Sequence, residues 1–89
     1  MLASTNIPEL QQRIALFDDQ SAYKELFVYF YKSLQQFAAS IVRSHEVAEE
    51  IVSDVFIKVW KKRAGLNRIN NLKLYLFIST RNGALNYLR

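Results

Sequence analysis

Basic side chains fill the second half of the chain with no acid among them. After Asp54 the sequence contains no further Asp or Glu, and the basic residues that follow are Lys58, Lys61, Lys62, Arg63, Arg68, Lys73, Arg81 and Arg89. Lys and Arg without counter-charges suit the phosphates of a nucleic acid, because binding releases the counterions condensed on those phosphates. An acidic block stands directly before this stretch: Glu46, Glu49, Glu50 and Asp54. The charge pattern predicts a polyanion as one partner of the chain.

No set of residues in the sequence has the composition of a catalytic or metal site. Cysteine is absent, which removes disulfides, thiolate catalysis and Cys-ligated zinc. His45 is the sole histidine, and its place beside a predicted helix cap favours a structural role. The scattered Ser and Thr residues have no base near them. We therefore expect a non-enzymatic protein that needs no metal and no cofactor.

Length and composition indicate one small all-α domain. The chain has 89 residues, enough for one modest core, and 51% of them are hydrophobic. With 2 Gly and 1 Pro, a few long helices account for the chain better than many short strands. No apolar run approaches the roughly 20 residues of a membrane span, and the first residues lack the features of a signal peptide. We expect a cytoplasmic protein without direct membrane contact.

Hydrophobic periodicity predicts four helices, over about residues 7–17, 20–43, 45–63 and 71–88. In the first helix, which Pro8 opens, Leu10, Ile14 and Phe17 recur at helical spacing. The second helix has the strongest pattern, with core positions at Tyr23, Leu26, Phe27, Phe30, Leu34, Phe37, Ala38 and Ile41. We expect a compact antiparallel three-helix core with a short additional N-terminal helix.

Polar residues before the second, third and fourth helices are candidate caps. Asp18 or Asp19 suits the second helix, Ser44 the third, and Asn70 or Asn71 the fourth. The pattern breaks over residues 64–71, which predicts a polar, Asn-rich loop between the third and fourth helices.

The third and fourth helices each present an unusual surface. On the third helix, the apolar face consists of Ala48, Ile51, Val52, Val55 and Val59. The opposite face contains Glu46, Glu50, Ser53 and Asp54, and Glu49 lies at its edge. Compensation of the helix dipole alone would also favour acids at this end. The fourth helix is apolar nearly all round, except for a narrow polar or small strip: Tyr75, Ser79, Asn82, Gly83 and Asn86. Such a helix is either buried centrally or leaves aromatic surface for a partner.

These stretches resemble region 2 of the extracytoplasmic-function group of sigma factors, the specificity subunits of bacterial RNA polymerase. The resemblance lies in AEEIVSDVFIKVW (48–60) and NLKLYLFISTRNGALNYLR (71–89), preceded by DDQSAYKELF and FAASIV in the second helix. It extends over residues 7–89. The fold it implies is that of a sigma region 2 domain.

The resemblance implies a polymerase-docking surface on the third helix. In the family, this helix binds the clamp helices of the largest subunit of core RNA polymerase, which present basic side chains. An exposed acidic face complements such a partner. Ser53 stands where family members commonly have Gln. The residues implied in docking are Glu46, Glu49, Glu50, Ser53 and Asp54.

The resemblance also implies binding and melting of the minus-ten promoter element by capture of unpaired non-template bases. Tyr75 replaces the usual Trp of the family, and Asn86 replaces a frequent Asp. The loop positions that match the family's base pocket are Leu66, Asn67, Arg68, Ile69, Asn70 and Asn71. Strand-binding positions on the helix are Tyr75, Phe77, Ile78 and Asn82, and the basic track includes Arg63, Lys73 and Arg81.

Two rival interpretations and two questions stay open. The apolar fourth helix would also suit a helical protein–protein interaction module without DNA binding. A helix-turn-helix that binds duplex DNA fits less well, because the gap between Arg63 and Asn71 is longer than the tight turn of that motif. Family members usually carry a second promoter-reading domain, which is absent from these 89 residues. An anti-sigma factor is an open further partner.

Overall fold

Each α-helix begins next to a residue whose side-chain oxygen accepts a hydrogen bond from the first turn. In the computed structural model, which describes residues 5–89, Asn6 caps α1 (Ile7–Phe17) and Asp19 caps α2 (Gln20–Val42). Ser44 caps α3 (His45–Lys61), and Asn71 caps α4 (Leu72–Leu88). These oxygens satisfy amide groups that have no partner within the helix. The predicted domain covers residues 1–89, of which residues 1–4 lie outside the described part.

The helices end where the backbone leaves the α conformation. Asp18 and Arg43, directly after α1 and α2, adopt left-handed conformations with φ of 52° and 61°. α3 ends at Lys61, two residues before the predicted end at Arg63, because the chain tightens into a 3₁₀ helix, η1 (Arg63–Arg68). Part of the predicted loop is therefore helical.

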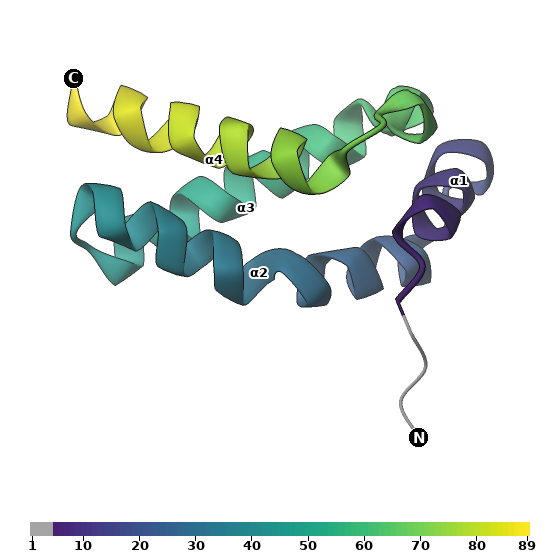
Figure 1. Cartoon of the computed structure of the whole chain (residues 1–89), viewed down its shortest axis with the longest axis horizontal. Coiled ribbons are helices and arrows are strands. Elements are labelled where there is room, and N and C mark those ends of the chain that lie inside the picture. Colours follow the sequence, from purple (N-terminus) through teal and green to yellow (C-terminus); the bar gives the residue numbers. More distant parts are fainter. Residues whose placement is uncertain (1–4) are drawn as a thin grey trace.

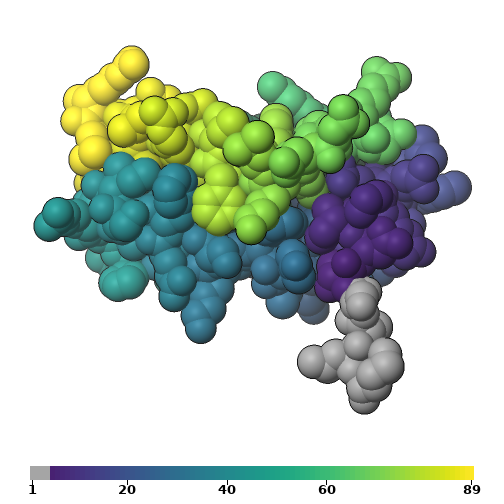
Figure 2. All heavy atoms as spheres, viewed as in Figure 1, coloured from purple at the N-terminus to yellow at the C-terminus, as the bar shows by residue number. Residues whose placement is uncertain are grey.

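The last three α-helices form a bundle, and the prediction of an all-α fold is confirmed. Consecutive helices among α2, α3 and α4 run antiparallel, and α1 lies at one end of the bundle beside η1 (Figure 1). Figure 2 shows α1 in contact with the chain around η1. The larger buried cluster joins all four α-helices and η1 through Leu10, Ile14, Leu26, Phe30, Leu34, Val52, Phe56, Leu66, Leu72 and Leu76.

The burial of two phenylalanines differs from expectation. Phe17, which the helical spacing placed with Leu10 and Ile14, is 75% exposed, because α1 ends there and the chain turns away at Asp18. Phe56, outside the apolar face expected for α3, is only 1% exposed and packs edge-on against Phe27. Within residues 5–89, no helix combines the length and apolar character that crossing a membrane requires.

Candidate nucleic-acid and polymerase interface

Four carboxylates and one serine of α3 form an acidic face. Glu46, Glu49, Glu50, Ser53 and Asp54 are all exposed, and together they line a depression of about 490 Å³. The ion pairs of the described chain, Arg13–Asp19 and Arg63–Asp18, use none of them. Burial, and secondarily the charge of Glu49, raise the pKa of the Tyr31 hydroxyl on α2. Because the carboxylates are not neutralised within the described chain, the acidic face is suited to a basic partner.

A groove of about 390 Å³ separates α3 from α4. The polar strip of α4 forms one wall, with Tyr75, Ser79, Asn82, Gly83 and Asn86, and α3 contributes Lys58 and Lys62. Beside the groove, Gly83 of α4 lies close to Ile51 of α3. A Cβ atom at position 83 would lie 3.0 Å from Ile51 Cγ2, so glycine permits the two helices to approach each other here. The groove thus combines two cations with an aromatic ring and amides. These groups suit a nucleic-acid backbone, an unstacked base and base edges, respectively. We call it the α3–α4 groove.

Asp54 belongs to both surfaces. It lines the depression of the acidic face and also the α3–α4 groove, where Lys58 lies one helical turn further along α3. The two surfaces therefore meet at one carboxylate.

A second polar pocket lies between α1 and the loop that follows α3. Its volume is about 430 Å³, and the loop contributes Asn67, Ile69 and Asn70 to its lining. Gln11 of α1 is 4% exposed, and its Nε2 donates hydrogen bonds to the carbonyls of Leu66, at 2.8 Å, and Ile69, at 2.9 Å. These bonds fix the loop on both sides of Asn67 and Arg68. We call this cavity the loop pocket.

Two residues expected to bind DNA make contacts within the chain. Leu66 is 2% exposed, so its side chain belongs to the core and not to a pocket. The Arg63 guanidinium is 4.2 Å from the centre of the Trp60 ring, and it also donates to Asp18, at 2.7 Å, and to the Trp60 carbonyl. Two of its five N–H donors are therefore engaged within the chain.

The remaining expected DNA contacts lie around α4. Asn71, Lys73 and Phe77 border a small hollow of about 280 Å³ at the start of the helix. Asn71 Oδ1 is used as the cap, and Phe77 packs against Phe37 of α2 with ring centres 5.2 Å apart. Arg68, Ile78 and Arg81 are exposed. The loop pocket, the α3–α4 groove and this hollow thus take in part of the expected set, and Arg68, Ile78 and Arg81 line none of the three.

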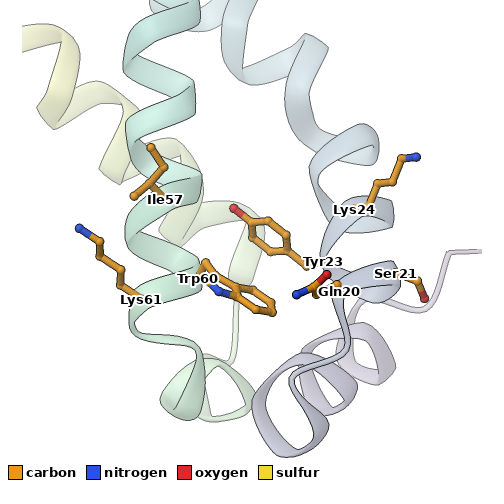
Figure 3. A pocket seen from close by; sticks show the side chains of 7 residues that line it. All are labelled: Gln20, Ser21, Tyr23, Lys24, Ile57, Trp60 and Lys61. Carbon is orange, nitrogen blue, oxygen red and sulfur yellow. The ribbon is translucent and has the colours of Figure 1, made fainter.

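A further groove, of about 630 Å³, lies between the start of α2 and the end of α3 (Figure 3). Its floor includes Tyr23 and Trp60, whose ring centres are 4.8 Å apart, and both pack against the core. The Tyr23 hydroxyl donates to the Phe56 carbonyl at 2.6 Å, and burial raises its pKa. These aromatic rings hold α2 and α3 together and lie outside the expected DNA site.

His45, the sole histidine, has a structural contact. Its Nδ1 lies 2.9 Å from the Nε2 of Gln35, within hydrogen-bond distance.

Several residues of these surfaces were not among the expected DNA contacts, although Lys58 and Lys62 belong to the basic stretch of the sequence. Lys58, Lys62, Ser79 and Asn86 line the α3–α4 groove, and α1 supplies Gln11 to the loop pocket. A signal for the groove existed, since the polar strip of α4 is visible in the sequence. No periodic signal relates α1 to the loop, which is more than 50 residues away along the chain.

Comparison with known proteins identifies the family of the chain. Residues 26–89 match the family model of sigma-70 region 2. The chain belongs to the sigma-70 region 2 family. As a domain of this family it is not an enzyme; it binds core RNA polymerase and recognises and melts the minus-ten promoter element. No curated protein and no solved structure matched the chain.

Membership of the sigma-70 region 2 family selects between the interpretations left open by the sequence. It favours DNA binding over an interaction module that binds protein alone. The matched segment contains α3, η1, α4 and most of α2, and thus both the acidic face and the α3–α4 groove. α1 lies outside it.

Proposed function

We propose that the α3–α4 groove and the loop pocket hold the minus-ten non-template strand, while the acidic face docks on the clamp helices of the largest polymerase subunit. The observation that carries the DNA assignment is the α3–α4 groove, where Lys58 and Lys62 face the polar strip of α4. Among the expected contacts, Asn67, Arg68, Asn70, Lys73, Tyr75, Ile78, Arg81 and Asn82 keep exposed side chains and remain the proposed set.

In this mechanism the domain melts DNA by selective capture. Unpairing and unstacking a base costs a few kcal/mol. Stacking on an aromatic ring such as Tyr75 returns roughly 1 to 3 kcal/mol per base, and phosphate contacts with Lys58 and Lys62 add to this. Because only the unpaired strand makes these contacts, binding shifts the equilibrium toward the melted promoter. Polymerase holds the strand in place from outside the domain.

The salt dependence of DNA binding tests the groove. The double variant Lys58→Ala/Lys62→Ala is compared with Lys24→Ala/Lys32→Ala, which removes the same charge from exposed positions of α2 outside the groove. The probe is a fluorescent minus-ten non-template strand with core polymerase present. We expect the groove variant to bind more weakly, with the slope of log affinity against log salt reduced by about 0.7 for each phosphate that the variant no longer neutralises. The control pair should keep the wild-type slope.

Equal losses of affinity in the two double variants would overturn the groove assignment, because they would show a general effect of net charge. Circular dichroism of both variants checks that the helices remain intact. Substitution of an exposed Lys on a helix changes stability little, so folding should not obscure the comparison.

We also propose that the chain belongs to the extracytoplasmic-function group of sigma factors and that an anti-sigma factor binds it. The stretches 48–60 and 71–89 support the extracytoplasmic-function group, in which a second domain reads the upstream promoter element. The exposed apolar side chains of α4, including Leu74, Leu85 and Leu88, are surface that an anti-sigma factor would cover. The gene sequence following the codon of Arg89 tests the second domain, and co-purification of a bound regulator from the native cell tests the anti-sigma factor.

A further inference from the structure

One wall of the loop pocket comes from α1, the helix that lies outside the family match. The α1 side of the pocket consists of Asn6, Pro8, Glu9, Gln11 and Gln12. The whole loop pocket has a volume of about 430 Å³, which falls within the range of roughly 300 to 1,000 Å³ typical of small-molecule sites. Apart from Pro8 and Ile69, the lining residues on both sides are polar, and most carry amides.

Gln11 holds the two walls of this pocket at a fixed separation. Both protons of its Nε2 are used, since they bond the carbonyls of Leu66 and Ile69. Its Oε1 accepts no hydrogen bond from the described chain. This buried amide therefore has an acceptor to spare at the pocket, where it is itself a lining residue.

Glu9 adds a second and stronger acceptor to the same wall. It is exposed in the first turn of α1, where its backbone N–H bonds the Asn6 side chain. Its carboxylate takes part in neither ion pair of the described chain. An ionised carboxylate can only accept hydrogen bonds, whereas the amides of Asn67, Asn70 and Gln12 both donate and accept. The α1 wall is thus biased toward ligands that donate.

We propose that α1 completes a base-binding pocket in which Glu9 selects an unpaired base that carries an exocyclic amino group. The inference rests on the proposed function, in which the loop binds the minus-ten non-template strand. Adenine, cytosine and guanine present an N–H₂ group on the edge exposed by unpairing, and thymine presents carbonyl oxygens with a single ring N–H. Thymine oxygens facing Glu9 would meet a like partial charge. Arg68, exposed on the same loop, supplies a cation for an adjacent phosphate in this proposal.

A base-substitution series with Glu9→Gln tests this role. The probes are non-template oligonucleotides in which each minus-ten position carries A, C, G or T in turn, and binding is measured with the full chain and core polymerase. The wild type should disfavour thymine at one position, and Glu9→Gln should reduce that discrimination roughly five- to tenfold. The matched control is Glu25→Gln, which makes the same charge change at an exposed position of α2 away from the pocket.

The outcomes separate this inference from the function on which it rests. If no oligonucleotide binds better than a scrambled strand, the proposed function itself fails. If the wild type selects bases and Glu9→Gln keeps the same profile as Glu25→Gln, the role of α1 fails while the proposed function stands. A thermal unfolding curve for Glu9→Gln shows whether the variant is folded, and Gln12→Ala, on the same wall, provides a second variant that alters the pocket without changing charge.

Discussion

Thr80 places a hydroxyl in the middle of the protein, where no described residue forms a hydrogen bond with it. The residue is fully buried in α4, and among the described residues its Oγ1 has no hydrogen-bond partner. A buried polar group without a partner costs about 1 to 3 kcal/mol relative to one that is satisfied. Thr80 is thus a local source of instability in a small core.

Replacing this hydroxyl with a methyl group should stabilise the domain. Thr80→Val keeps the shape of the side chain and removes the unpaired oxygen, so we expect the free energy of unfolding to rise by about 1 kcal/mol. Urea denaturation followed by circular dichroism measures the change. Thr80→Ser is the control, since it keeps the hydroxyl, loses a buried methyl and should destabilise. A less stable Val variant would mean that Oγ1 has a partner in solution.

Residue type and position predicted which side chains of α3 are exposed, but they did not predict the contacts that Arg63 and Leu66 make within the chain. The acids of α3 could be placed because one face of a regular helix follows from spacing alone. Arg63 and Leu66 lie where the helix changes to a 3₁₀ turn, and there the direction of a side chain depends on tertiary contacts. Arg63 is held by Asp18, 45 residues earlier, which no local pattern specifies.

At the scale of the elements, the cap of α2 makes stability depend on pH. Asp19 accepts hydrogen bonds from the backbone of Ala22 and from the side chains of Arg13 and Ser21, and these bonds hold the pKa of its carboxyl below the usual range. A lowered folded-state pKa contributes stability above the unfolded-state value of about 3.9. That contribution is lost as the pH falls through the lower folded-state value.

The variant Asp19→Asn isolates this contribution. Asn can still cap the helix through its side-chain oxygen, but it does not titrate and cannot pair with Arg13. Between about pH 5 and pH 2, we expect the urea midpoint of the wild type to fall more steeply than that of the variant. Glu25→Gln, which removes a carboxylate that forms no ion pair in the described chain, should leave the wild-type slope intact. Parallel pH profiles for Asp19→Asn and the wild type would contradict the assignment.

Helices and their caps were the most predictable elements. Periodicity placed all four α-helices, with starts and ends within two residues of those observed, because caps and apolar stripes are local signals. η1 has no such signal, since a short 3₁₀ helix contains too few residues to show a period. Its position is set by Leu66, which enters the core between other elements.

For the whole molecule, the shared position of Asp54 relates the two binding surfaces. It places a negative charge at the α3–α4 groove, where proposed DNA phosphates would also lie, and it belongs to the acidic face. A basic side chain of polymerase paired with Asp54 would remove this repulsion. Polymerase docking and DNA capture should then favour each other by the same free energy, whichever comes first.

Neutralising Asp54 should therefore have opposite effects on the two partners. In Asp54→Asn we expect weaker polymerase binding, and a roughly two- to fivefold gain in affinity for single-stranded minus-ten DNA without polymerase, as for one screened charge pair near a surface. Glu46→Gln is the control, because it removes one charge from the acidic face outside the α3–α4 groove. It should weaken polymerase binding alone. The same gain in DNA affinity for both variants would show that only net charge matters.

The hydrogen bonds of Gln11 also have a consequence for motion. α1 has 11 residues, too few for a stable isolated helix in water, so it stays folded only while it is docked on the core. Undocking would break both Gln11 bonds, melt α1 and remove one wall of the loop pocket in a single local opening event, at less cost than global unfolding. A captured base that touches both walls opposes this opening. Promoter DNA should thus slow amide hydrogen exchange throughout α1, far along the chain from the loop.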